Sequence, residues 1–301
     1  MKIIFSRKGY DSATGKIPSP IFDDETFCSL PIPSRRRKPK LRDIRFQRTN
    51  LGSLVGQLKK KPRVTEEGVH LDPDLDSKAR PRKAGWLPCF GQVGAAQTHL
   101  NRQNVGKGDL FLFFGWFCRV LKSNGELRYD PDALDIHCLF GWLQVGDVYQ
   151  PGIDDRILPK WASDHPHVQY AGEKYYKRAK NNTLYVASPH LRLPGLRRSV
   201  AGGGIFPRFT GSLQLTAPGY SRSMWRFPNL FYPTRGVWPL SYHAHPKHWS
   251  RDKKGVLLST VGRGQEFVLD CENYPKALDW IKEIFKAAPT IDSNRRSAAR
   301  G

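Results

Sequence analysis

The sequence predicts an α+β fold, with a single domain around a mixed, partly barrel-like β-sheet, a few helices and long loops. Three observations support this prediction. Two long apolar runs of strand type, residues 109–121 and 135–149, follow each other in the middle of the chain. Helical periodicity is confined to three shorter segments, and the Gly- and Pro-rich second half offers few regular elements. We expect the domain to span residues 1–290 and to be followed by a disordered basic tail, 291–301.

The first predicted elements are an apolar strand at residues 3–5 and a short helix at 51–58. A longer helix is expected over 90–109, because residues from Val93 to Leu100 follow three- and four-residue steps typical of one helix face. The glycines near residue 106 are expected to end it.

The two apolar runs each contain the tripeptide Phe-Gly-Trp, and a turn signal, Asn124-Gly125, lies between them. We therefore expect a hairpin-like pair in one sheet, where the glycines permit a close approach of the backbone. Three further elements are expected near the end of the chain: strands at 255–261 and 265–271 and a helix at 274–288.

Charge is the strongest compositional signal. The 301 residues include 49 Lys and Arg against 27 Asp and Glu, which gives a formal net charge of +22. Such a surplus attracts polyanions, so nucleic acid, and DNA in particular, is the expected partner. No apolar run approaches the roughly 18 residues needed to span a bilayer. The sequence indicates neither a membrane partner nor an obligate protein partner.

The cysteines and the missing motifs narrow the classes of function. Five widely spaced cysteines without a Cys-x-x-Cys pair favour reduced thiols and a cytoplasmic protein. The sequence has no phosphate-binding loop, no Gly-x-Gly-x-x-Gly after a strand and no Gly-x-Ser-x-Gly elbow. We therefore expect no cofactor, and a nucleotide-consuming or nicotinamide-dependent enzyme is disfavoured.

The loop after the first strand carries candidate catalytic and binding groups. Arg7, Lys8, Asp11 and Ser12 lie in a segment that Gly and Pro residues bend. Polar groups at strand ends often serve binding or catalysis on a rigid scaffold. The alternative is a solvated turn.

A second loop brings a histidine close to two carboxylates. His70, Asp72 and Asp74 lie within the sequence His-Leu-Asp-Pro-Asp-Leu. Such proximity can raise one carboxyl pKa and give an acid–base pair. The alternative is a capping turn in which Asp74 faces solvent.

Two histidine-rich segments raise the question of metal binding. His243, His245 and His248 have spacings that can place them around a metal ion, but a loop that contacts phosphate or a base is as reasonable. The same question applies to His165 and His167. The sequence leaves it open, and we predict no metal site.

Two basic segments are predicted to contact DNA. Residues 34–48 carry eight basic residues, and a solvated loop is the alternative. Residues 224–239 interleave aromatic and basic side chains, which can stack on unpaired bases and hold phosphates. The candidate contacts are Arg35, Arg36, Arg37, Arg226 and Arg235 for the backbone and Trp225 for a base.

Six segments, in order along nearly the whole chain, resemble the third of the nucleotide-modification-associated domain families. They are residues 5–33, VHLDPDL (69–75), FGQVGAAQTHL (90–100), VGKGDLFLFFGWF (105–117), HCLFGWLQVGD (137–147) and NNTLYVA (181–187). That family is linked by genomic context to altered bases in phage and bacterial DNA. The resemblance implies that the polar groups of the two loops are the site, although Lys16 stands where a second glycine is expected. The central strand pair also looks like that of PUA-like folds, small barrels that read modified bases.

These observations favour a DNA glycosylase that removes a modified, bulky base, as expected of antiviral defence. The reaction needs water, a carboxylate and a pocket, and no donor. Asp11 is the first candidate for the carboxylate, and Asp72 or Asp74 is the second. Arg7 and Lys8 are expected to clamp phosphates. The candidate base-pocket residues are Tyr10, Gln92, His137, Asn182 and Trp225. A non-catalytic reader of modified DNA and a base-modifying transferase are the alternatives.

Overall fold

A nine-stranded mixed sheet organises the computed structural model, which describes residues 1–34, 38–234, 236–262 and 264–288. Its main path runs β16–β1–β8–β10–β11–β7, and β2, β9 and β12 pair with β8 or β10 beside that path. The strands are β1 (Lys2–Arg7), β2 (Ser19–Ile21), β7 (Cys89–Gln92), β8 (Leu110–Ser123), β9 (Glu126–Tyr129), β10 (Ile136–Tyr149), β11 (Thr183–Ala187), β12 (Gly203–Ile205) and β16 (Glu266–Asp270).

The long central strands β8 and β10 form because most of their side chains are buried on both faces. All five residues from Leu110 to Phe114 are fully buried, and such strands appear in a sequence as continuous apolar runs. β8 and β10 pair antiparallel, with Leu112 opposite Trp142, so the predicted strand pair is confirmed. The Asn124-Gly125 turn joins β8 not to β10 but to the short strand β9.

The glycines of the two Phe-Gly-Trp tripeptides lie where backbones approach closely, as predicted. A Cβ atom on Gly115 would lie 2.9 Å from the carbonyl oxygen of Lys8, and one on Gly141 would lie 2.8 Å from that of Gly204. Any larger residue at either position would push the neighbouring backbone away.

The predicted α+β single domain around a mixed sheet is confirmed, and the sheet does not close into a barrel. The path ends at β16 on one side and β7 on the other. The outer edge of β7 is paired locally instead, because Asp74 and Cys89 exchange two backbone hydrogen bonds. An edge protected in this way needs no barrel closure.

Three small sheets complete the strands. They are β13 (Met224–Phe227), β14 (Trp249–Asp252) and β15 (Gly255–Ser259) in one sheet, β3 (Ile32–Pro33) with β6 (Val69–His70), and β4 (Arg45–Phe46) with β5 (Thr49–Asn50). The two predicted C-terminal strands are therefore present as β15 and β16, but they belong to different sheets.

The α-helices are α1 (Leu51–Lys59), α2 (Gly94–Arg102), α3 (Pro166–Gln169), α4 (Lys174–Ala179) and α5 (Ala277–Ala287). Six short 3₁₀ turns lie in the described ranges, at Leu41–Asp43, Pro62–Glu66, Lys160–Asp164, Gly211–Leu213, Asn229–Phe231 and Pro246–His248. The predicted helix over 90–109 is too long at both ends. Residues 89–92 pair with β11 as strand β7, and α2 ends at Arg102. No helix in the described ranges is long and apolar enough to cross a membrane.

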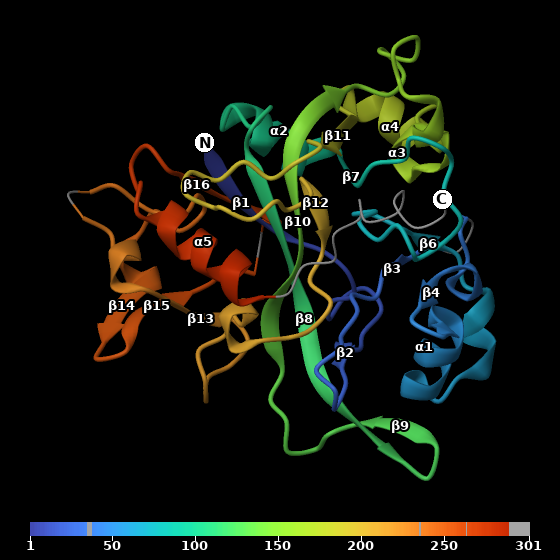
Figure 1. Cartoon of the computed structure of the whole chain (residues 1–301), viewed down its shortest axis with the longest axis horizontal. Coiled ribbons are helices and arrows are strands. Elements are labelled where there is room, and N and C mark those ends of the chain that lie inside the picture. The colour runs from blue at the N-terminus through green and yellow to red at the C-terminus, as the bar shows by residue number, and fades with distance from the viewer. Residues whose placement is uncertain (35–37, 235, 263, 289–301) are drawn as a thin grey trace.

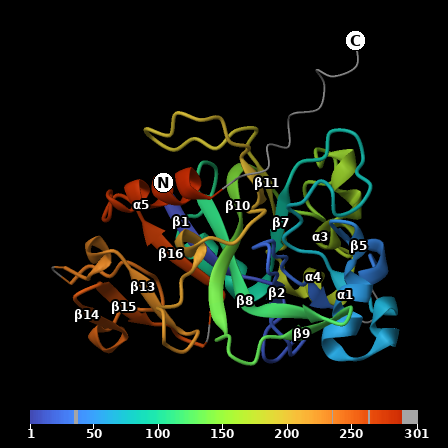
Figure 2. The ribbon, with the colours of Figure 1, turned by 60° about the horizontal axis from the view of Figure 1, so that its bottom comes forward.

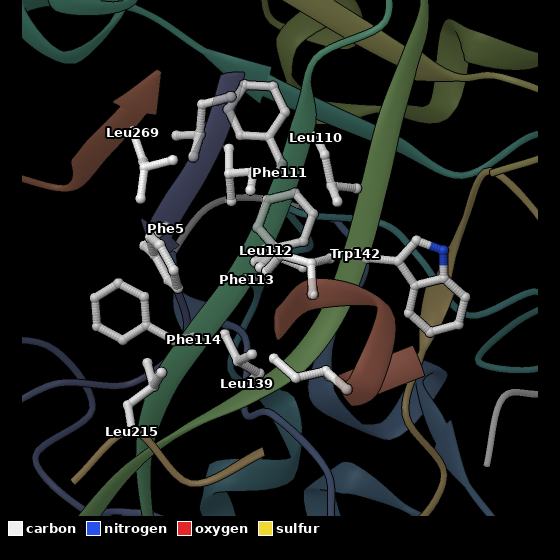
Figure 3. Close-up of a cluster of buried hydrophobic side chains, with 14 of the residues drawn as sticks. Phe5, Leu110, Phe111, Leu112, Phe113, Phe114, Leu139, Trp142, Leu215 and Leu269 are labelled. Carbon is white, nitrogen blue, oxygen red and sulfur yellow. The ribbon is translucent and has the colours of Figure 1, made fainter. Parts of the chain in front are cut away.

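Figures 1 and 2 show β8 and β10 crossing the middle of the molecule, with α5 and the three-stranded sheet on one side and α1, α3 and α4 on the other. The main core lies along the long strands, where Phe5, Leu112, Phe114 and Trp142 gather (Figure 3). Helix α5 closes part of this core through Phe285, whose ring centroid lies 5.3 Å from that of Trp142. The predicted tail, 291–301, is outside the described residues.

Candidate active site

A cleft of about 340 Å³ lies beside the edge strand β7 and is walled by parts of the chain that are far apart in sequence. The end of β1, the β3–β6 pair, β7 and the segment of α3 and α4 all contribute to its lining. The lining residues that can carry charge are Arg7, Lys8, His70, Asp72 and His167, and Gln92 adds a neutral amide. Members of both candidate loops thus meet in one cleft.

Local backbone structure brings Asp72 to this cleft. β6 pairs with β3, which places His70 opposite Ile32, and the chain then turns so that the Asp72 N–H donates to the His70 carbonyl at 3.0 Å. The peptide bond between Asp72 and Pro73 is cis. Gly91 of β7 donates its N–H to Asp72 Oδ1 at 2.8 Å, which anchors the carboxylate to the sheet edge.

Three imidazole rings surround the Asp72 carboxylate. The Nε2 atoms of His70 and His167 each lie 3.4 Å from Oδ2, and the Nε2 atom of His165 lies 3.4 Å from Oδ1. Asp72, His165 and His167 are buried, whereas His70 is half-buried. In the described part of the chain, His70, Asp72 and His167 form a group whose metal-ligating atoms lie within 4.8 Å of one another.

Hydrogen bonds determine which nitrogen of each buried histidine carries a hydrogen. Asn182 donates its Nδ2 to the His167 carbonyl at 2.8 Å, so its Oδ1 faces His167 Nδ1 at 2.7 Å and accepts that N–H. His165 Nδ1 accepts the backbone N–H of His167 at 3.3 Å. In the neutral rings, His167 therefore presents an Nε2 lone pair to Asp72, and His165 presents an Nε2–H.

The histidines keep Asp72 ionised. Burial by itself would raise the pKa of Asp72. Interactions with His165, His167 and His70, which lower it when their Nε2 atoms carry a hydrogen, outweigh burial and hold that pKa well below its ordinary value. A buried carboxylate that stays charged beside several imidazoles can orient a water molecule, bind a cation or stabilise positive charge on a sugar.

Glycine at position 91 makes room for this arrangement. A Cβ atom there would lie 2.2 Å from the Cδ2 atom of His167, so a side chain would displace the imidazole ring. The strand that donates to Asp72 therefore also provides the space in which His167 packs over it.

A buried ion pair holds two other lining residues of the cleft, Lys8 and Gln92. Lys8 Nζ lies 2.8 Å from Glu266 Oε1, and Gln92 Nε2 donates to the same oxygen at 2.6 Å. The Lys8 ammonium also lies 4.5 Å from the centre of the Phe90 ring. Glu266 Oε2 is buried without a hydrogen-bond partner among the described residues. Lys8 and Gln92 are thus positioned in the cleft by Glu266.

The other candidates of the first loop hydrogen-bond to groups of the chain itself. Arg7 lines the cleft, and its guanidinium donates to the backbone carbonyls of residues 261 and 262, both at 3.1 Å. Asp11 Oδ1 accepts two N–H groups of its own turn, at 2.9 and 2.5 Å. Ser12 accepts a hydrogen bond from Arg222. Asp11 and Ser12 serve the turn and its neighbour, and the cleft lining does not include them.

Asp74 lies in different surroundings from Asp72. Arg82 donates to both of its carboxylate oxygens at 2.6 Å, and Arg80 lies 3.4 Å away. Asp74 is buried and does not face solvent. The contacts with Arg80 and Arg82 account for the position of Asp74. A proton shared with Asp72 is not needed to explain it.

Of the five predicted base-pocket residues, Gln92 lines the cleft and the other four are buried elsewhere. Asn182 supports His167, and the Trp225 indole N–H donates to His137 Nδ1 at 3.1 Å inside the main core. Tyr10 packs in a second core cluster beside α1. These four side chains pack against other residues of the protein and do not line the cleft.

Of the arginines that the two basic segments were predicted to place on the DNA backbone, the structure describes only Arg226. Arg226 makes two hydrogen bonds to the Asp252 carboxylate, at 2.6 and 2.7 Å, so its guanidinium is engaged within the chain. Arg35, Arg36, Arg37 and Arg235 lie outside the described residues.

The other histidine-rich segment binds backbone groups. His243 Nδ1 lies 2.9 Å from the Ser241 carbonyl, and its Nε2 accepts the Val261 N–H. His245 accepts a backbone N–H at 3.1 Å, and His248 lies 3.1 Å from a carbonyl. In the described ranges, these three do not form a metal-type group.

Acid is expected to destabilise the fold through His137. Burial, together with the charges of Arg7 and Arg222, lowers the pKa of His137 to about 3 from 6.5. The unfolded chain takes up this proton near pH 6.5 and the folded chain does not, so stability is full above that pH and falls as the pH drops toward 3. At about pH 5 the expected loss is about 2 kcal/mol.

Urea unfolding at neutral pH and at about pH 5 tests this prediction. The matched variant is His137→Asn, because the amide oxygen can accept the Trp225 N–H without titrating. We expect a shallower dependence of unfolding free energy on pH in the variant. The same slope in both proteins would contradict the assignment.

One exposed aromatic residue of the cleft has no counterpart in the sequence-based predictions. Tyr175 in α4 lines the cleft and is 60 % exposed. The adjacent Tyr176 is buried against His167, with ring centroids 5.2 Å apart. An exposed aromatic ring beside a cleft can stack on an unpaired base. The sequence signal for Tyr175 is a Tyr-Tyr pair in a basic segment. This pair points to a binding residue only once the structure shows which ring is exposed.

Residues 2–270 match the family described as nucleotide modification associated domain 3. No curated protein and no solved structure shows a significant match to the chain.

Proposed function

Because the chain belongs to the family of nucleotide modification associated domain 3, we propose that it acts on modified bases in DNA as a glycosylase. In this reaction the bond between the base and the sugar is hydrolysed and an abasic site remains. The observation that supports the proposal is the cleft in which an ionised Asp72, two histidines and an exposed Tyr175 lie together.

The charge and the shape of the cleft suit an extruded nucleotide. A net charge of +22 attracts the DNA backbone, and Arg7 places positive charge in the cleft wall. Extrusion of a base costs a few kcal/mol of stacking, which a new stacking partner partly offsets. We assign this role to Tyr175, which lines the cleft together with Gln92.

The proposed chemistry is centred on Asp72 rather than on Asp11. A water molecule held by Asp72 and its histidines attacks the anomeric carbon as the bond to the base nitrogen breaks. The water loses its proton to solvent, and the departing base takes up a proton from solvent. The negative charge of Asp72 stabilises the positive charge that develops on the sugar.

Incubation of the purified chain with three DNA duplexes of one sequence tests the proposal. Their cytosines are plain, hydroxymethylated or glucosylated at the hydroxymethyl group, and hot alkali then cleaves abasic sites. We expect strand breaks and free base from modified DNA, and intact strands from plain DNA.

Two results would contradict excision. Retarded but intact modified DNA would indicate a non-catalytic reader. A mass increase of the DNA in the presence of a donor, without strand breaks, would indicate a base-modifying transferase.

A further inference from the structure

We infer that His70, Asp72 and His167 bind a divalent first-row transition metal ion, with an open coordination position toward the cleft. The role of the ion in water activation rests on the proposed function, but the binding itself does not. All three residues line the cleft, so a ligand entering it reaches the space between them.

The spacing of the three groups fits a metal ion better than direct hydrogen bonds. Both Nε2 atoms lie 3.4 Å from Asp72 Oδ2, longer than the usual length of about 2.7–2.9 Å for a charge-assisted hydrogen bond. Zinc lies about 2.0–2.2 Å from nitrogen and oxygen ligands, and two such ligands at a tetrahedral angle are about 3.4 Å apart. The two Nε2–Oδ2 separations match that value, and the two Nε2 atoms lie within 4.8 Å of each other.

The surroundings of His167 are those of a metal ligand. Its Nδ1–H is held by Asn182, which leaves the Nε2 lone pair facing a carboxylate oxygen that is also an electron donor. Two lone pairs that face each other repel unless a proton or a cation lies between them. Metal-binding histidines usually donate their second N–H to a carbonyl or carboxylate in this way.

The neighbours of Asp72 serve as supports rather than ligands. Gly91 binds Oδ1 from the sheet edge, and the buried Nε2 of His165 lies 3.4 Å from the same oxygen in a geometry that makes no hydrogen bond. Both groups act on Oδ1 and leave Oδ2 for a cation. A buried imidazole N–H without a strong partner is explained if Asp72 shifts slightly when an ion binds.

The donor set selects the kind of ion. Two imidazole nitrogens and one carboxylate oxygen suit zinc, iron, cobalt or nickel, whereas magnesium and calcium prefer oxygen ligands. Three protein ligands with an open position are typical of catalytic rather than structural sites. A bound ion would lower the pKa of a coordinated water, which supplies the nucleophile for the proposed hydrolysis.

Cobalt titration of the tag-free chain, without DNA, tests the inference by visible absorption and calorimetry. We expect one Co²⁺ per chain and displacement by Zn²⁺. Loss of a ligand in His70→Ala or His167→Ala is expected to weaken binding by about 100-fold or more, because even supporting residues contribute about 10–100-fold. His245→Ala is the control, since this exposed histidine lies outside the group.

A second pair of variants leaves all ligands in place. Gly91→Ala is expected to weaken Co²⁺ binding because the new methyl group displaces the His167 ring. Gly106→Ala is the matched control, because a Cβ atom there meets nothing within 4 Å. Thermal unfolding of each variant confirms that it is folded.

The inference is wrong if the wild-type chain binds no Co²⁺, or if the ligand variants bind it as tightly as the wild type. The cluster would then be a polar contact between Asp72 and the imidazoles without an ion. Failure of base excision with intact Co²⁺ binding would instead count against the glycosylase alone, so the two proposals fail separately.

Discussion

Replacing Asp72 by Asn is expected to lower the rate of base release from modified DNA by about 100-fold or more. The substitution keeps the size of the side chain and an oxygen that can accept the Gly91 N–H, but it removes the negative charge. That charge holds the water in the proposed mechanism and stabilises the sugar as the base departs. Single-turnover kinetics with alkali cleavage measure the effect.

The other two candidate carboxylates provide matched comparisons. Asp11→Asn is expected to change the rate by less than about twofold, because an amide oxygen can still accept the two N–H groups of its turn. Asp74→Asn is expected to destabilise the fold, because Arg80 and Arg82 lose a buried negative partner. A large loss of base release in Asp11→Asn, with Asp72→Asn active, would overturn the assignment of the site.

The parts of the fold that the sequence predicted are those that local pattern determines. The apolar runs of β8 and β10 and the periodic segments of α1 and α5 contain their own signals. β7 was assigned to a helix because its four residues precede α2 without a break in pattern. Its strand conformation depends on pairing with β11, about ninety residues later, which no local pattern reveals.

The site was predictable in part for the same reason. His70 and Asp72 lie two residues apart, so sequence proximity identified them. His167 was considered only beside His165, because the contact with Asp72 arises from the packing of α3 against β7. The Asp11 turn, by contrast, carries a local signal, since Asp followed by small residues and Gly often binds its own backbone.

The aromatic and basic segment at 224–239 shows that composition alone does not place side chains. Trp225 and Phe227 alternate with Arg226, which is the two-residue period of a half-buried strand. In β13 the aromatic rings face the core and Arg226 pairs with Asp252. A surface that stacks bases is expected to have the same composition. Only the two-residue period distinguishes a half-buried strand from such a surface.

The buried pair of Lys8 and Glu266 is expected to contribute strongly to stability. Lys8→Met should lower the free energy of unfolding by about 3–5 kcal/mol, because Glu266 is then left buried without its cation. Urea unfolding measures the change. Lys286→Met is the control, since its pair with Glu283 is exposed, and it should change stability by less than about 1 kcal/mol.

The double variant Lys8→Met, Glu266→Gln separates a structural role of Lys8 from a role in binding DNA. The neutral pair leaves no buried charge, and Gln92 can still donate to the amide oxygen at position 266, so we expect the double variant to be more stable than Lys8→Met alone. If Lys8→Met instead kept full stability and lost DNA affinity with a reduced salt dependence, Lys8 would be a phosphate contact. Its ammonium would then leave Glu266 when DNA binds, and Glu266 would hold the cation in place only in the free protein.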